Sequence, residues 1–281
     1  MQIGTRLFDG AGPFLMGVIN ATPDSFSDGG RYLEPERAVA QAERLAGEGA
    51  DLIDLGGEST RPGAEPVDAA EERRRVVPVI ERLRAAGFAL PISVDTSKVE
   101  VARAALEAGA DLVNDVTGLR DPLLAELVAR AGVPVVLMHT RGTPRDMATR
   151  TNYADLLGEV AEELRAALGR AAAAGIAADR TILDPGLGFA KTPAQTVELL
   201  ARVGELKALG RPLLVGPSRK RFIGELTGAS AEARLPGTLA AVTACVLAGV
   251  ELIRVHDVAA ARQASQVAKA LRDAGGSPSL R

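Results

Sequence analysis

Eight short apolar runs along this chain each end in a polar or ionisable residue. These terminal residues are Asn20, Glu58, Asp95, Asn114, His139, Asp184, Ser218 and His256. A buried carboxylate that faces N–H donors gains charge-assisted hydrogen bonds, so residues of this kind are suited to hold a polar ligand. Strands buried on both faces consist of continuous Val, Ile and Leu. A polar residue at nearly every carboxyl end therefore predicts one shared site at that end of a parallel sheet.

Eight strands are needed to bring these residues to one edge. We predict them at residues 13–20, 51–57, 91–96, 112–118, 134–140, 180–187, 212–218 and 251–258. Segments with helical spacing lie between or after them, for example Glu36–Glu48, Ala69–Ala86, Ser97–Ala108, Tyr153–Ala174, Pro193–Leu209 and Ala259–Ala274. An open doubly wound sheet would also alternate strands and helices. Polar ends on nearly all the strands favour a closed (β/α)8 TIM barrel, an α/β fold.

Length and composition agree with one barrel domain over residues 1–281, with a mobile tail expected at 273–281. The length is close to the roughly 250 residues of a typical barrel. Hydrophobic residues make up 47% of the chain but aromatic residues only 3%, so the core must be aliphatic. The net charge of −3 leaves no basic face, which argues against a nucleic-acid partner.

The chain shows no sign of a membrane span or of export. The uncharged stretch Leu235–Val250 is shorter than the roughly 18 residues of a membrane span and predicts a buried helix that contains Cys245. This single cysteine excludes an intrachain disulfide. The first six residues lack the pattern of a secretory signal, so we expect a cytoplasmic enzyme.

Two connections, 21–30 and 58–66, are long and rich in turn residues. Both follow early strands at the predicted site, where such loops commonly act as lids, although an ordinary surface loop is the alternative.

Lysine is rare here, with five lysines among 33 basic residues. Lys220 follows the seventh predicted strand, where barrels frequently hold phosphate. The alternative for Lys220, and equally for Lys98, is a solvated lysine at the start of a helix.

Common nucleotide and zinc motifs are absent. Residues 186–192 resemble a phosphate loop, but Ala190 stands where the Walker pattern needs glycine. The two histidines are 117 positions apart, which gives a histidine-rich zinc site little support. Any metal should be a hard cation such as Mg²⁺, held by few protein oxygens and by substrate phosphates.

Motifs from the first predicted strand to the last resemble the dihydropteroate synthase family. They are Ile19-Asn-Ala-Thr-Pro-Asp-Ser-Phe-Ser-Asp-Gly-Gly30, Asp54-Leu-Gly-Gly-Glu-Ser-Thr-Arg-Pro-Gly63, Ser93-Val-Asp-Thr96, Asn114-Asp115, Leu137-Met-His139, Leu183-Asp-Pro-Gly-Leu-Gly-Phe189, Ser218-Arg-Lys220 and Arg254-Val-His-Asp257. One departure is Thr140-Arg141, where the family commonly has an apolar residue. The resemblance implies condensation of 6-hydroxymethyl-7,8-dihydropterin diphosphate with 4-aminobenzoate, which yields 7,8-dihydropteroate and diphosphate.

The resemblance also implies three subsites. The pterin would be bound by Asp95, Asn114, Asp184, Lys220, Met138 and Gly216. The diphosphate would be bound by Asn20, acting through Mg²⁺, together with Thr60, Arg61, Arg254 and His256. The 4-aminobenzoate pocket would contain Phe26, Thr60, Arg61, Pro62, Phe189 and Ser218, and it is the target of sulfonamides. For Asp95 and Asn114, capping of a helix or turn is the alternative, and Arg254 alone could be a solvated charge.

Catalysis in this family is thought to begin with dissociative loss of diphosphate, so no enzyme nucleophile is required. The resemblance assigns catalysis to Lys220, Arg254 and His256, with Asp28 or Asp24 ordering the first loop around Mg²⁺. Either Arg61 or a helix-start amide near Ser218 would hold the aminobenzoate carboxylate. We also expect a homodimer, although the sequence alone does not determine the oligomeric state.

Two other functions share part of this pattern. A methyltetrahydrofolate:corrinoid methyltransferase uses the same Asp/Asn/Asp pterin recognition but needs no diphosphate site, so Ser218-Arg-Lys220 and Arg254-Val-His256 argue against it. A non-catalytic pterin-binding paralogue would not need intact motifs at every strand.

Overall fold

Eight parallel strands form the centre of the molecule in the computed structural model, which describes residues 1–9, 12–21, 34–59 and 63–275. They are β3 (Phe14–Asn20), β4 (Leu52–Gly56), β5 (Ile92–Asp95), β6 (Leu112–Asp115), β7 (Val135–Met138), β8 (Thr181–Asp184), β9 (Leu214–Val215) and β10 (Leu252–Val255). Their order in the sheet is β8-β7-β6-β5-β4-β3-β10-β9. A parallel bridge between Leu183 and Leu213 joins the two ends. This arrangement confirms the TIM barrel and excludes the open doubly wound sheet.

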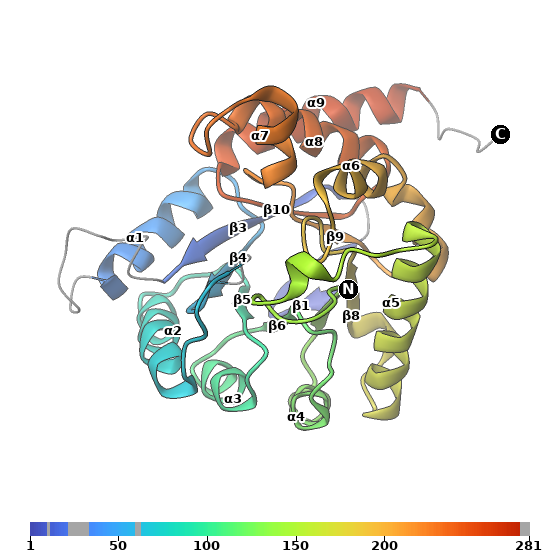
Figure 1. Cartoon of the computed structure of the whole chain (residues 1–281). Helices are drawn as coiled ribbons and strands as arrows, with labels where there is room; N and C mark the ends of the chain where they lie inside the picture. The colour runs from blue at the N-terminus through green and yellow to red at the C-terminus, as the bar shows by residue number, and fades with distance from the viewer. Residues whose placement is uncertain (10–11, 22–33, 60–62, 276–281) are drawn as a thin grey trace.

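The helices surround the strands, as Figure 1 shows. They are α1 (Glu34–Gly47), α2 (Ala69–Ala85), α3 (Val99–Glu107), α4 (Pro122–Ala131), α5 (Leu156–Ala173), α6 (Pro193–Ala201), α7 (Arg221–Thr227), α8 (Leu235–Leu247) and α9 (Val258–Ala274). The predicted helix Pro193–Leu209 is divided, because α6 is followed by a 3-10 segment at Val203–Leu209. The predicted tail overlaps α9 at Asp273 and Ala274, and residues 276–281 lie outside the described residues.

Side chains that point into the barrel follow the two-residue period of a strand. An apolar layer near the amino ends consists of Met16, Leu52, Leu112, Val136, Ile182, Leu214 and Leu252. Two residues further along β4, β6, β8 and β10 lie Asp54, Asn114, Asp184 and Arg254. The barrel interior therefore changes from apolar to polar within one side-chain layer. The alternate residues, such as Ile53, Val113 and Ile253, pack outward against the helices.

An N-terminal hairpin covers the amino end of the barrel. Its strands β1 (Gln2–Ile3) and β2 (Arg6–Leu7) are antiparallel, and Ile3 and Phe8 belong to the same apolar cluster as the inner barrel layer. The sequence analysis missed this hairpin because each strand has only two residues, too few to show a period.

Helix α8 matches the buried helix predicted for Leu235–Val250. Its thiol, Cys245, is fully buried, and burial raises the pKa of Cys245 to about 12. The thiol is therefore protonated at neutral pH and is not a nucleophile. Among the described residues, no helix is both long enough and apolar enough to span a membrane.

The hairpin should contribute stability without affecting the opposite end of the barrel. We predict that Ile3→Ala lowers the free energy of unfolding by about 2–4 kcal/mol, because Ile3 is fully buried and its loss leaves a cavity. Leu7→Ala in the same hairpin should change it by less than about 0.5 kcal/mol, because Leu7 is 65% exposed. Urea denaturation measures both values, and equal effects of the two substitutions would contradict the role of Ile3 as a plug.

Candidate active site

A buried network of charges lies in the polar layer of the barrel. Arg254 donates from Nε to Asp54 Oδ2 over 2.6 Å and from Nη2 to Asp95 Oδ2 over 2.9 Å. Asn114 Nδ2 donates to the same Asp54 oxygen over 3.0 Å. Strands β5 and β6 place Asp95 directly beside Asn114 in register. Asp95, Asn114 and Arg254 thus bond to one another or to Asp54 rather than capping a helix or facing solvent.

The network contains more acceptors than its own donors use. Among the described residues, the buried atoms Asp54 Oδ1, Asp95 Oδ1 and Ser93 Oγ have no hydrogen-bond partner. Burial, followed by the neighbouring Asp54 carboxylate, raises the pKa of Asp95 to about 7, and the Arg254 guanidinium opposes this rise. Unpaired buried oxygens are costly, so the site is suited to a ligand that brings N–H donors into the barrel.

Asp184 lies at the end of β8, beside Met138 of β7 in register. Its Oδ1 accepts a hydrogen bond from Gly186 N over 2.7 Å, which ties the carboxylate to the loop that follows. Burial raises the pKa of Asp184, while Lys220 and Arg254 lower it. Gly186 has a φ of 66°, and a Cβ there would lie 2.0 Å from the His139 carbonyl oxygen, so only glycine fits.

Lys220 and Phe189 contact each other above Asp184. The Lys220 ammonium lies 4.3 Å from the centre of the Phe189 ring, a cation–π distance. Lys220 directly precedes α7, but its side chain makes no cap. Lys220 is half-buried, and its charge lies close enough to Asp184 to lower the pKa of that carboxyl.

Ser218, three residues after β9, and His256, directly after β10, form a second polar pair. Ser218 Oγ lies 2.9 Å from His256 Nδ1 and accepts from the His256 backbone N–H over 3.3 Å. Arg219, between Ser218 and Lys220, has a φ of 55° and makes two hydrogen bonds to Asp257. These bonds fix Arg219 and so orient the adjacent residues Ser218 and Lys220. Gly216 lies close to Arg254, since a Cβ there would be 3.7 Å from Arg254 Cβ.

Three of the residues singled out in the sequence, Glu58, Lys98 and His139, have other surroundings. Strand β4 ends at Gly56, so Glu58 is not its terminal residue; its Oε1 accepts from Val67 N, and its other oxygen binds Lys98. Lys98 also binds the buried Glu72, so it bridges two carboxylates and is not solvated. His139 faces a separate buried cluster around Lys191.

Asp54 is the residue of the charge network that was not predicted from the sequence. It is fully buried and receives two of the three hydrogen bonds in the network. The sequence predicted Glu58 as the polar end of this strand, but Glu58 lies beyond Gly56, the last residue of β4. The buried carboxylate is Asp54, which lies inside the strand. The sequence could have indicated Asp54, because it lies two residues after Leu52 and successive inward side chains of a strand are two residues apart.

Several predicted site residues lie outside the described residues. They are Asp24, Phe26, Asp28, Thr60, Arg61 and Pro62. Asn20 is described: it ends β3 opposite Gly56 and is half-buried. The ranges that the structure describes contain no group of three His, Cys, Asp or Glu side chains arranged for a metal ion. Asn20 nevertheless offers an amide oxygen of the kind that suits Mg²⁺ bound chiefly by substrate oxygens.

Comparison with known proteins identifies relatives over nearly the whole chain. Residues 16–256 match the family model described as pterin binding enzyme. The dihydropteroate synthase of Synechocystis sp. is 46% identical over 274 residues, covering 96% of this chain and 94% of that protein. A Yersinia pestis dihydropteroate synthase structure with a sulfonamide drug complex has a TM-score of 0.91 and 42% identity, covering 98% of this chain and 99% of the other. A structure of the Xanthomonas albilineans dihydropteroate synthase with 4-aminobenzoic acid has a TM-score of 0.87 and 52% identity. It covers 92% of this chain and 93% of the other.

The charge network leads us to a prediction about the pKa of Asp95. Asp54→Asn should lower the pKa of Asp95 from about 7 toward its ordinary value of 3.8, because it removes a nearby negative charge and leaves Arg254 to stabilise the Asp95 carboxylate. Carboxyl ¹³C NMR titration measures this shift. As a control, Asp111→Asn removes a carboxylate that pairs with Arg84 and should leave Asp95 unchanged. An Asp95 carboxyl that still titrates near 7 would show that burial alone sets its pKa.

Proposed function

The chain belongs to the dihydropteroate synthase family of pterin-binding enzymes, and we propose that its strand-end residues carry out this reaction in the roles set out below. It is a transferase that joins 6-hydroxymethyl-7,8-dihydropterin diphosphate to 4-aminobenzoate, releasing diphosphate. The observation that best supports the proposed roles is the buried layer of Asp54, Asp95, Asn114 and Arg254, whose unpaired oxygens face the barrel interior.

Asp95, Asn114 and Asp184 bind the pterin in this proposal, together with Lys220. The aminopyrimidinone edge of a pterin presents adjacent N–H donors, which match the carboxylate oxygens of Asp184 and Asp95. The Lys220 ammonium donates to the ring carbonyl and to a ring nitrogen. Met138 adjoins Asp184 and Gly216 adjoins Arg254, so in this proposal these two residues line the flat faces of the pterin ring.

Arg254 binds the diphosphate together with His256. Two carboxylates hold the Arg254 guanidinium, so it is oriented and charged before the reaction. As the bond between the pterin methylene and diphosphate breaks, negative charge grows on the leaving oxygen, and Arg254 and His256 stabilise it. The amine of 4-aminobenzoate then attacks the electron-poor methylene carbon.

Asn20 would hold Mg²⁺ through its amide oxygen, with diphosphate oxygens as further ligands. When bound, Mg²⁺ would neutralise charge on the departing diphosphate. Thr60 and Arg61 complete the proposed diphosphate site, and Asp24 or Asp28 would order the first loop; all four lie outside the described residues.

The 4-aminobenzoate pocket is proposed to include Phe189 and Ser218, with Phe26 and residues 60–62 from outside the described ranges. Its carboxylate would bind Arg61 or a backbone amide near Ser218. Sulfonamides mimic this substrate and would occupy the same pocket. We further propose that the enzyme acts in the cytoplasm as a homodimer.

The activity can be tested by following diphosphate release with the pterin diphosphate in the presence and absence of 4-aminobenzoate. We expect release coupled to formation of dihydropteroate and dependent on Mg²⁺. Methyl transfer from methyltetrahydrofolate to a corrinoid, with no diphosphate release, would instead favour the methyltransferase alternative. Pterin binding without either reaction would indicate a non-catalytic protein.

Asp184→Asn should weaken binding of the pterin diphosphate about 100-fold or more, which corresponds to about 3 kcal/mol. The asparagine oxygen can keep the bond from Gly186 N, but its NH₂ group would face a pterin donor. Calorimetry measures the affinity. Asp179→Asn, an exposed carboxylate near the other end of the same strand, serves as the control. Near-native affinity in a folded Asp184→Asn protein would remove Asp184 from the pterin site.

A further inference from the structure

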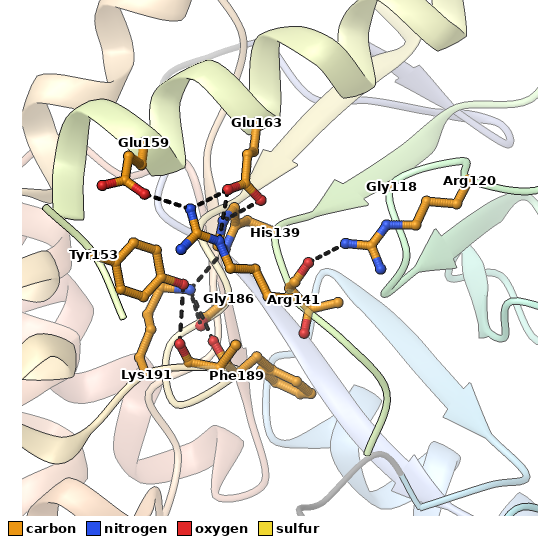
Figure 2. Close-up of polar contacts among 12 residues, drawn as sticks. Gly118, Arg120, His139, Arg141, Tyr153, Glu159, Glu163, Gly186, Phe189 and Lys191 are labelled. Carbon is orange, nitrogen blue, oxygen red and sulfur yellow. Dashed lines mark hydrogen bonds and ion pairs between the residues drawn. The ribbon is translucent and has the colours of Figure 1, made fainter. Parts of the chain in front are cut away.

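Lys191 is a buried lysine that, among the described residues, makes no hydrogen bond to a proposed substrate-binding side chain. It lies between β8 and α6, is 7% exposed, and its ammonium group has three acceptors. These are His139 Nδ1 at 2.8 Å, the Gly186 carbonyl at 3.1 Å and the Phe189 carbonyl at 3.0 Å, as Figure 2 shows. An ammonium group has three N–H donors, so all of them are used. Burial lowers the pKa of Lys191 to about 7, so these contacts offset only part of the cost of burying the charge.

His139 connects Lys191 to helix α5. Because an ammonium group has no lone pair, His139 Nδ1 accepts from it, and the ring proton then lies on Nε2, 3.2 Å from Glu163 Oε2. Burial lowers the pKa of His139 to about 4, in keeping with a neutral ring that accepts a hydrogen bond. Arg141 binds the same Glu163 carboxylate and also Glu159. The cluster thereby links the ends of β7 and β8 to one helix.

The loop that Lys191 holds has an unusual backbone. Gly186, Gly188 and Ala190 all have positive φ values, of 66°, 76° and 50°. Alanine rarely adopts this conformation, so the surrounding contacts must maintain it. Lys191 binds two carbonyls within the loop, and Tyr153 Oη donates to a third, that of Ala190, over 3.0 Å. The Tyr153 ring is in turn covered by the Arg141 guanidinium, 4.0 Å from its centre.

Phe189 lies at the tip of this loop, with its carbonyl on Lys191 and its ring beneath the Lys220 ammonium. A shift of the loop would move the ring away from the Lys220 ammonium. We propose that Lys191, supported by His139, is a positioning residue that holds Phe189 and, through it, Lys220 in the geometry needed for 4-aminobenzoate to react. This inference depends on the proposed function, because it takes Phe189 as part of the aminobenzoate pocket.

The test compares steady-state kinetics of three variants with the wild-type enzyme. Lys191→Met keeps the chain length but removes the three donors; we expect the KM for 4-aminobenzoate to rise about 10-fold and kcat to fall, with pterin affinity reduced less than about threefold. Asp95 and Asn114, on other strands, would preserve most of the pterin contacts. Tyr153→Phe removes only the hydrogen bond to Ala190 and should shift the same KM in the same direction by a smaller factor.

Lys207→Met is the matched control. Lys207 also donates to a carbonyl and a carboxylate, those of Gly249 and Glu251, but it lies at the amino end of the barrel. The Lys207→Met substitution should lower Tm without changing the KM for 4-aminobenzoate or for the pterin diphosphate. A wild-type KM for 4-aminobenzoate in folded Lys191→Met overturns the positioning role, and if that variant does not fold, an unchanged KM in Tyr153→Phe overturns it. Failure of the wild-type enzyme to form dihydropteroate would instead refute the proposed function.

Discussion

The structure depends on a half-buried cation held between two buried carboxylates in the centre of the barrel. Arg254 bonds to Asp54 and Asp95, and Asn114 completes the group. Removing three charges from water is costly, so these side chains must meet at one height, from strands that are distant in sequence. The parallel register of β4, β5, β6 and β10 achieves this. A slip of one residue in any of them would turn its polar side chain outward into the helical layer.

Stability and chemistry occupy opposite ends of the same interior. At the amino end, the apolar layer and the hairpin residues Ile3 and Phe8 exclude water. At the carboxyl end, the polar layer retains oxygens that accept no hydrogen bond from the described residues. Because the apolar layer lies directly beneath the polar one, it excludes water from the charges above it and gives them a rigid base. Binding of a polar ligand then requires little rearrangement of the strands.

The β8–α6 loop extends this rigidity to the part of the site that strands alone do not form. Two of its left-handed residues are glycines, which adopt this conformation freely, but the third is Ala190, which needs the surrounding contacts to keep it. A lysine and a histidine behind the loop hold it in that shape, and the aromatic ring of Phe189 in front of it receives the Lys220 ammonium. Lys191 behind the site and Lys220 within it are thus connected through Phe189.

The sequence by itself determined the barrel, because strand-length apolar runs with polar ends can be read from local spacing, and it determined the family from motifs along the whole chain. Asp95, Asn114 and Asp184 could be named as candidates from this spacing, and Arg254 from the family motifs. Tertiary structure alone decided which partners they meet. Asp54 lies inside an apolar run, the strands of the hairpin have only two residues each, and Lys191 and His139 are 52 positions apart. These contacts depend on the closure of the barrel and on the direction of side chains across it, which no local pattern encodes.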